Sequence, residues 1–326
     1  MTRFILGRLA TGVLVILAVA TISFFLLQAA PGGPFDEERA VPPEVKRNVE
    51  KKYHLDWSVG RQYVAYMDAL LPVDIFEQND RGAVSLSWGG VKKPDLGHSM
   101  KRTQTVEEII AQSFPVSAKL GLMALFFAAL AGIFLGVLAA SRHNTWWDHG
   151  AMGAALVGIS IPSFVLGPVL IMIFALGLKW LPPAQYTGFS SLILPGAALG
   201  MIYMGVIARL SRGGMLEILR QDYIRTARAK GLPERAVVWK HGVRLGLMPV
   251  VTYLGPAAAH LVAGTFVIEK IFQLPGLGFY GVASIADRDY PLLCGVLVFY
   301  SVFLVVLNLL VDISYGILDP RIRGKR

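Results

Sequence analysis

The amino-acid sequence predicts an all-α integral membrane protein with six transmembrane helices. Hydrophobic residues make up 54% of its 326 residues and charged residues only 16%, whereas a soluble domain carries about 25% charged residues. Charges are also absent from six windows of about 20 or more residues, the length that a helix needs to cross a bilayer. Because a charged side chain is costly in the hydrocarbon, each window predicts one span.

The six windows cover residues 9–35, 120–141, 149–178, 180–208, 245–268 and 290–311. The first also resembles a signal peptide, because Arg3 and Arg8 precede it and Ala29 and Ala30 stand near its end. Its apolar run of about 19 residues is longer than the roughly 7–15 residues of a signal sequence. We therefore expect an uncleaved first helix.

The basic residues are divided unequally between the two sides of the predicted membrane. The N-terminus, the loops 142–148 and 209–244 and the tail 319–326 contain 16 Lys or Arg against 5 Asp or Glu. The segments 36–108, 179–189 and 287–289 contain 13 against 15. Because basic loops stay in the cytoplasm, both termini are predicted to be cytoplasmic. The net charge of +9 then reflects topology and does not support nucleic-acid binding.

This topology divides the chain into four parts. They are a first transmembrane helix (1–35), an extracytoplasmic segment (36–110), a membrane core of five helices (111–318) and a cytoplasmic tail (319–326). Short helices are expected near 43–52 and 62–71. Small residues four apart predict close helix packing: Ala128, Gly132, Gly136, Ala140, Gly196 and Gly200. Prolines inside the windows predict bends: Pro162, Pro168 and Pro256.

Motifs for catalysis and cofactor binding are absent from the sequence. The chain has no Walker A motif (G-x-x-x-x-G-K-[ST]) to hold a nucleotide, no H-E-x-x-H and no G-x-S-x-G. Its six histidines are scattered over both sides of the membrane, and the single cysteine, Cys294, lies in an apolar window where a thiol is usually inert. We therefore expect no enzyme activity, no metal site and no cofactor in this chain.

Ionisable residues are missing from the window centres, where an ion-coupled transporter usually places them. His260 is the exception, and a hydrogen bond to a neighbouring helix is its simpler interpretation. Four charged residues stand at window edges, where they are expected to extend toward the interface: Lys119, Glu269, Lys270 and Asp312. Energy for uphill transport is therefore expected from a partner, with an ion-coupled secondary transporter as the alternative.

The cytoplasmic loop 209–244 has the pattern of two helices joined by a corner. Apolar residues recur at 215, 216, 219 and 223, the spacing of an amphipathic helix. This helix is expected to continue to Lys230 and to end at Gly231, which suits a left-handed C-cap. Pro233 suits the first turn of a second helix, with Glu234 near its positive end. Small and basic residues at the corner favour docking of another protein; a basic anchor on anionic lipid is the alternative.

A set of motifs in this order and spacing resembles the permeases of ABC importers of the oligopeptide and dipeptide branch, most closely the B-type transmembrane subunit of the oligopeptide permease. The coupling (EAA) loop of that branch is matched by Arg225, Thr226, Ala227, Arg228, Ala229, Lys230, Gly231 and Leu232. Further matches occur at 30–35, 42–44, 53–55, 95–99, 114–121, 161–164, 269–272, 288–290 and 319–321. Arg225 replaces the Glu of the general EAA pattern, Pro249 lies 18 residues past Gly231, and 74–93 looks like an insertion of unassigned function.

The resemblance implies a type I ABC importer fold in a bacterial inner membrane and half of a translocation path for oligopeptides. The implied partners are a homologous second permease, two cytoplasmic ATPases that hold ATP and Mg²⁺, and an extracytoplasmic peptide-binding receptor, together with membrane lipid. The loop 225–232 would be the coupling helix. An outer gate or receptor contact would involve Leu274, Pro275, Gly276, Leu277, Gly278, Asp287, Arg288 and Asp289. A dipeptide or nickel importer permease is the alternative, and substrate-binding residues are not assigned.

Overall fold

The computed structural model describes residues 2–29, 53–78, 84–263 and 265–318. The chain divides into two compact units. Unit 1 comprises residues 1–5, 113–279 and 304–326, and unit 2 comprises residues 6–112 and 280–303. Three long helices run from one unit into the other, namely α1 (Thr2–Ala29), α4 (Val106–Ser141) and α14 (Tyr290–Leu318). The units are described separately below.

The helices long and apolar enough to cross a membrane match the six predicted windows. Four do so as single helices: Ile5–Ala29, Val106–Ser141, Phe189–Leu219 and Tyr290–Ile313. Two bent helix pairs add two further spans if each pair is counted as one: Trp146–Ser160 with Ser163–Gly177 at 108° and Glu234–Gly246 with Met248–Ala263 at 53°. The described part of the chain therefore contains four to six spans, in agreement with the predicted transmembrane fold.

The bends occur at only some of the expected prolines. The first lies at Ile161 and Pro162, between α5 (Trp146–Ser160) and α6 (Ser163–Leu170), where proline cannot donate the hydrogen bond that would continue a helix. The second lies at Leu247, between α10 (Val243–Gly246) and α11 (Met248–Ala263). Pro168 and Pro256 instead lie inside α6 and α11, so no break occurs at either.

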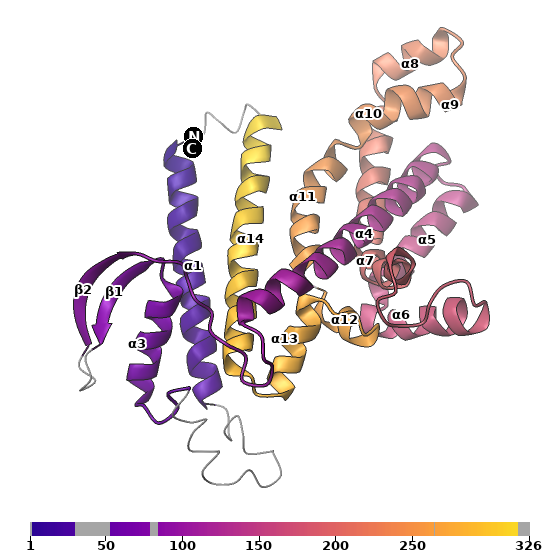
Figure 1. Cartoon of the computed structure of the whole chain (residues 1–326). Coiled ribbons are helices and arrows are strands. Elements are labelled where there is room, and N and C mark those ends of the chain that lie inside the picture. The colour runs from indigo at the N-terminus through magenta and orange to yellow at the C-terminus, as the bar shows by residue number, and fades with distance from the viewer. Residues whose placement is uncertain (1, 30–52, 79–83, 264, 319–326) are drawn as a thin grey trace. The chain divides into compact units, whose positions relative to one another are not determined.

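The helix α7 (Ile193–Leu219) lies at the centre of unit 1, in contact with α5, α6, α10 and α11 (Figure 1). Small residues bring the helices together, as predicted. A Cβ atom added to Gly132 or Gly136 of α4 would lie closer than 3.0 Å to backbone carbonyl oxygens of α7. The same holds for Gly205 of α7 against Ala155 of α5. These backbones therefore touch, and larger side chains would separate them.

The part of unit 1 that is predicted to lie near the outer side of the membrane shares the same apolar core. The short helix η1 (Ile171–Gly177) follows α6, and η2 (Phe189–Leu192) leads into α7. The helix α12 (Phe266–Ile271) contacts α6 and α7 and precedes α13 (Leu277–Ala286), whose first residues belong to this unit. Leu120, Leu192, Leu261, Phe272 and Leu274 are all buried in one cluster. The outer loop is thus continuous with the apolar core.

Unit 2 combines most of α1, the whole of α3 (Val59–Leu70) and one end each of α4 and α14 with a β-hairpin. The helix α3 includes the predicted helix 62–71 except its last residue, and it packs Met67 against Ala20 of α1 and Val298 of α14. The strands β1 (Val73–Gln78) and β2 (Val84–Val91) pair antiparallel, with Val73 opposite Val91 and an irregularity between Asp74 and Phe76. The predicted insertion 74–93 is largely this hairpin. The expected helix at 43–52 lies outside the described residues.

Candidate functional site

The predicted coupling corner starts with a helix that is separate from α7. We expected one helix from 215 to Lys230, but α7 ends at Leu219 and Gln221 is extended, with φ −70° and ψ 153°. A new helix, α8 (Asp222–Ala229), begins there. The break allows Ile224 to fold back onto the end of α7, where it is fully buried with Ala227 and Val237 against Ile218 and Leu219. Burial of this apolar face outweighs the continuation of a regular helix.

The end of α8 is closed by the glycine that the sequence predicted. Gly231 has φ +74°, and its N–H donates to the carbonyl oxygen of Arg228 at 2.9 Å. The Leu232 N–H donates to the carbonyl oxygen of Ala227 at 3.4 Å. This pair of bonds is the Schellman motif, which favours glycine at its left-handed position. A Cβ atom on Gly231 would meet no atom within 4 Å, so the requirement comes from the backbone angle.

The second half of the corner begins at Pro233. Its carbonyl oxygen accepts from the N–H groups of Ala236 and Val237, which starts α9 (Glu234–Ala236). The chain then continues through η3 (Val237–Gly242) and α10 to α11. Figure 1 shows α8 and α9 side by side beyond the ends of α4 and α5. The corner therefore projects from unit 1 and is connected to α7 on one side and, through η3 and α10, to α11 on the other.

An ion pair connects the two halves of the corner. Arg228 Nη2 donates to Glu234 Oε1 at 2.7 Å and Arg228 Nε donates to Glu234 Oε2 at 3.1 Å. Arg228 Nη1 also reaches the carbonyl oxygen of Leu219 at 3.5 Å. The two parallel bonds fix the guanidinium in one geometry. Arg228, selected from the sequence as a charge for docking, thus also connects α8 to α9 and to the end of α7.

The remaining predicted residues of the corner lie at its surface. Arg225, Thr226, Ala229, Lys230, Gly231 and Leu232 are exposed, as is Tyr223 beside them. Ala227 is buried instead, because it packs inside the chain. Arg225 has only a long 3.5 Å ion pair with Asp222, between two highly exposed side chains. The exposed face of α8 is therefore rich in basic and small residues, and the opposite face is buried against the rest of the chain.

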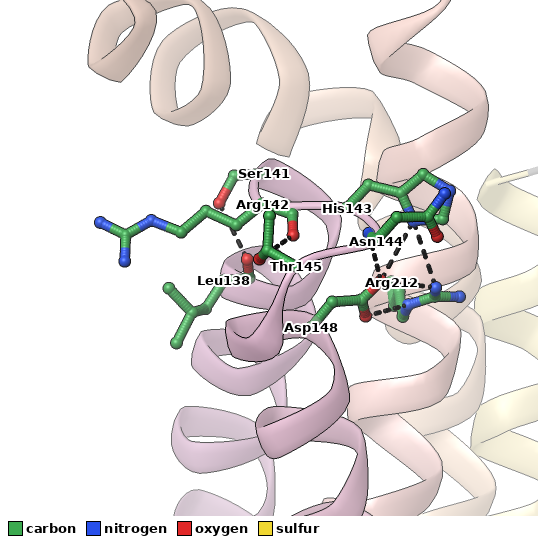
Figure 2. Close-up of polar contacts among 8 residues, drawn as sticks. All are labelled: Leu138, Ser141, Arg142, His143, Asn144, Thr145, Asp148 and Arg212. Carbon is green, nitrogen blue, oxygen red and sulfur yellow. Dashed lines mark hydrogen bonds and ion pairs between the residues drawn. The ribbon is translucent and has the colours of Figure 1, made fainter.

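A second polar cluster supports α7 close to the corner, and the sequence did not reveal it. Asp148, at the start of α5, accepts two hydrogen bonds from Arg212 of α7, from Nε at 2.7 Å and from Nη2 at 2.8 Å (Figure 2). The Asn144 N–H donates to the same carboxylate at 3.0 Å, and His143 Nδ1 lies 3.1 Å from it. The Asp148 residue is only 1% exposed. This cluster ties the turn between α4 and α5 to α7.

The outer loop 274–278 is held around a buried carboxylate. Glu269 of α12 is fully buried, although its place at a window edge predicted that it would extend to the interface. Its Oε2 accepts from the Phe279 N–H at 2.8 Å, and the Leu277 N–H donates to Ser117 Oγ at 2.8 Å. A Cβ atom on Gly276 would lie closer than 3.0 Å to the Glu269 carboxylate. Glu269 lies outside the candidate spans, and its burial raises its pKa.

The predicted residues of the second outer segment have different environments. Asp289 is buried, accepts from Ser99 Oγ and from the Met100 N–H (3.0 Å), and so holds the turn at 98–102 to the start of α14. Asp287 is exposed and lies 3.7 Å from Arg102. Arg288 has φ +54°. Of these three residues, Asp289 is the one that is buried and hydrogen-bonded inside the chain.

Metal-ligand geometry is not found in the described residues. No group of three or more His, Cys, Asp or Glu side chains there is arranged to hold a metal ion. Cys294 is buried in α14. The carboxylates of Asp148, Glu234 and Asp289 accept hydrogen bonds from the chain's own donors. Glu269 accepts through Oε2, whereas its buried Oε1 has no hydrogen-bond partner among the described residues. Such clusters fix helices and loops in position.

Comparisons with known proteins agree with this architecture. The family model described as "Binding-protein-dependent transport system inner membrane component" matches residues 132–324, and its N-terminal companion matches residues 1–121. The dipeptide transport system permease protein of Bacillus subtilis (strain 168) is 43% identical over 323 residues, covering 99% of this chain and 98% of that protein. The oligopeptide transport system permease proteins of Haemophilus influenzae and Escherichia coli (strain K12) are each 41% identical over 326 residues, covering 99% of this chain and all of those proteins.

The predicted resemblance is therefore confirmed over the length of the chain. One family model alone covers more than half of the residues, and the relatives align from end to end. The candidate membrane spans agree with a multi-pass protein of the inner membrane. The chain belongs to the family of binding-protein-dependent transport system inner membrane components.

Proposed function

We propose that this chain forms half of the translocation path of an ATP-driven importer of oligopeptides and that α8 is its coupling helix. Members of the family are non-catalytic membrane components, and ATP binds to a separate ATPase. The observation that carries the coupling role is the corner itself. One face of α8 is exposed, and its opposite face is buried against the end of α7. Gly231 ends the helix, and the ion pair between Arg228 and Glu234 connects α8 to α9.

The proposed partners follow from the family and from the relatives. Family membership implies a complex with an ATPase, a binding protein and a partner permease. We propose in detail a homologous second permease, two cytoplasmic ATPases carrying ATP and Mg²⁺, an extracytoplasmic peptide receptor and surrounding lipid. Dipeptides are a second candidate substrate, because the Bacillus subtilis relative, 43% identical, is a dipeptide permease. We also propose that the chain is divided into four parts, with boundaries after residues 35, 110 and 318.

The contacts of the corner supply a path for the coupling movement. When the ATPases close, they would displace the outward face of α8. The buried residues Ile224 and Ala227 pass this displacement to the end of α7, and the continuous path through α9, η3 and α10 passes it to α11. The ion pair of Asp148 with Arg212 adds the turn between α4 and α5 to the same body. Rigid-body movement of packed helices is an established way to transmit such a displacement.

The outer segments are proposed to respond to that movement. Leu274, Gly276 and Leu277 are fixed to the core through burial and through Glu269, so they would move with the helices that they contact. Asp287 and Arg288 are the proposed contacts for the receptor, since Asp289 is used inside the fold. Pro275 and Gly278 complete the proposed outer gate.

Transport by the reconstituted complex tests this proposal. We expect proteoliposomes that contain both permeases, the ATPases and the receptor to take up labelled oligopeptides only when ATP is present on the side of the membrane where the ATPases lie. A series from dipeptides to hexapeptides separates the two substrate candidates. Uptake driven by an ion gradient without ATP would contradict the proposal and would support a secondary transporter.

A further inference from the structure

An open pocket of about 310 Å³ lies on the surface where α5 meets α7. Its apolar wall consists of Met152, Ala155 and Leu156 from α5 and Gly205 from α7, and its basic end consists of Arg209 and Arg212. Gly205 and Ala155 are in backbone contact, so the two helices themselves form the wall. A ligand for this pocket must combine an anionic group with an apolar portion, because the lining separates into those two chemistries.

The two arginines differ in whether they have a counterion. Arg212 is paired with Asp148 through two hydrogen bonds. Within the described residues Arg209 has neither an ion pair nor a hydrogen bond, and its side chain is exposed. Arg209 precedes Arg212 by three residues, about one turn, on the same face of α7, where two like charges repel each other. The pocket therefore presents one uncompensated positive charge next to an apolar wall.

The position of the pocket along the helices corresponds to a lipid headgroup region. Arg209 directly follows the charge-free window 180–208. Asp148 pairs with Arg212 and Ala155 contacts Gly205, so α5 and α7 run antiparallel, with Arg209 between these two levels. The rings of Trp146 and Trp147 at the start of α5 are tilted by 31° with centroids 3.8 Å apart, and the Arg142 guanidinium lies 4.7 Å from the centroid of the Trp147 ring. Paired tryptophans and basic residues of this kind mark the membrane–water interface.

We infer that this pocket binds an anionic phospholipid, whose phosphate meets Arg209 and whose acyl chain lies along Met152 and Leu156. A basic pocket between transmembrane helices on the cytoplasmic side has the charge to hold an acidic headgroup. Leu156 is exposed, and an acyl chain would cover it. The bound lipid would lie on the surface that α5 and α7 form together, next to the ion pair of Asp148 with Arg212.

The experiment measures lipid retained by the purified complex, using native mass spectrometry after addition of phosphatidylglycerol or phosphatidylcholine. Wild type should retain phosphatidylglycerol in preference to phosphatidylcholine. Arg209→Gln should lower this retention at least about fivefold, given the attraction of one basic residue for an anionic lipid. Arg209→Lys should keep it. The matched control is Arg244→Gln, because Arg244 is also exposed and flanks an apolar window but does not line the pocket.

Three results would overturn the inference. Equal retention by wild type and Arg209→Gln would show that Arg209 does not hold the lipid, and equal retention of the two lipids would show that charge is not recognised. A photoreactive residue placed at 156 separates lipid from protein as the occupant. Its adduct should have the mass of one phospholipid, whereas a crosslink to the second permease would assign the pocket to the interface between subunits.

Discussion

Arg212 of α7 and Asp148 of α5 form an ion pair with two hydrogen bonds of 2.7 and 2.8 Å, in a site where Asp148 is almost completely buried. The two residues are 64 positions apart, and they join the turn between α4 and α5 to the helix that leads into the coupling corner. The corner is thus supported from two directions, by its own ion pair and by this one.

Breaking the buried pair should destabilise the protein. Arg212→Met leaves the Asp148 carboxylate buried without its counterion, which costs about 3–5 kcal/mol. Asp148→Leu leaves Arg212 unpaired but partly exposed, so its cost should be smaller. The double variant replaces both charges with apolar groups and should recover much of this loss. The unfolding temperature of the purified complex checks both effects. Arg142→Gln is the control, since the Arg142 side chain is exposed, and single variants as stable as this control would contradict the prediction.

Reversing the corner ion pair separates its internal role from docking. Arg228→Glu and Glu234→Arg each place like charges together, and each should reduce ATP-dependent uptake by up to about fivefold, because an exposed ion pair contributes at most about 1 kcal/mol. The double reversal restores an ion pair and should recover uptake. If Arg228 acted only by binding the ATPase, the double variant would remain as impaired as Arg228→Glu.

Gly231 should tolerate only residues that adopt a left-handed backbone. Gly231→Ile places a β-branched residue at φ +74°, at a cost of about 1–2 kcal/mol, and should abolish uptake and receptor-stimulated ATP hydrolysis while the protein remains in the membrane. Gly231→Asn is the matched control, because asparagine adopts this conformation more readily and the site has space for a side chain. Equal activity of the two variants would refute the capping role.

Glycine at 276 should be required by the carboxylate beneath it. Gly276→Ala drives a methyl group into Glu269 and should reduce uptake and stability, with a cost of about 1–3 kcal/mol for overpacking. Gly213→Ala is the control, since a Cβ atom on Gly213 in α7 meets nothing within 4 Å. Undiminished uptake after deletion of residues 274–278 would contradict the proposed gate.

The buried Glu269 should make stability depend on pH. Because burial raises its pKa above the ordinary 4.5, the folded protein binds the proton more tightly than the unfolded chain. The contribution of Glu269 to stability should therefore be greatest below about pH 4.5, and it should be lost as the pH rises through the folded pKa. Glu269→Gln keeps the shape without the charge and should remove this contribution. Unfolding free energies of both proteins across this pH range provide the measurement, and identical pH profiles would contradict it.

Local signals in the sequence were sufficient to predict the transmembrane spans and the residue at which the proposed coupling helix ends. Charge-free windows located the helices because the bilayer excludes charges over a length that local composition reveals. Gly231 was identifiable because a helix C-cap favours glycine. The small residues of α4 and α7 were identifiable because close helix packing demands them at every fourth position.

Features that depend on residues far apart in the chain were not predictable in this way. The break at Gln221 results from the packing of Ile224 against Leu219 and Val237, which no local helix signal contains. From the sequence, Asp148 was only the single acidic residue of the short loop 142–148, and nothing in that loop indicated that Arg212 of α7 would lie beside it. Glu269 looked like an interfacial residue because its window ended there, whereas the fold of 274–279 encloses it.

The contact between α8 and an ATPase is the central claim, and site-specific photocrosslinking tests it most directly. Tyr223 lies exposed on α8, so benzoylphenylalanine can replace it with a side chain of related shape. In the assembled complex this probe should crosslink to the cytoplasmic ATPase, with a yield that changes on ATP binding. The same probe at Trp180, exposed in a segment predicted to face outward, should not crosslink to the ATPase. Absence of the ATPase adduct at 223, or an equal adduct at 180, would contradict the account.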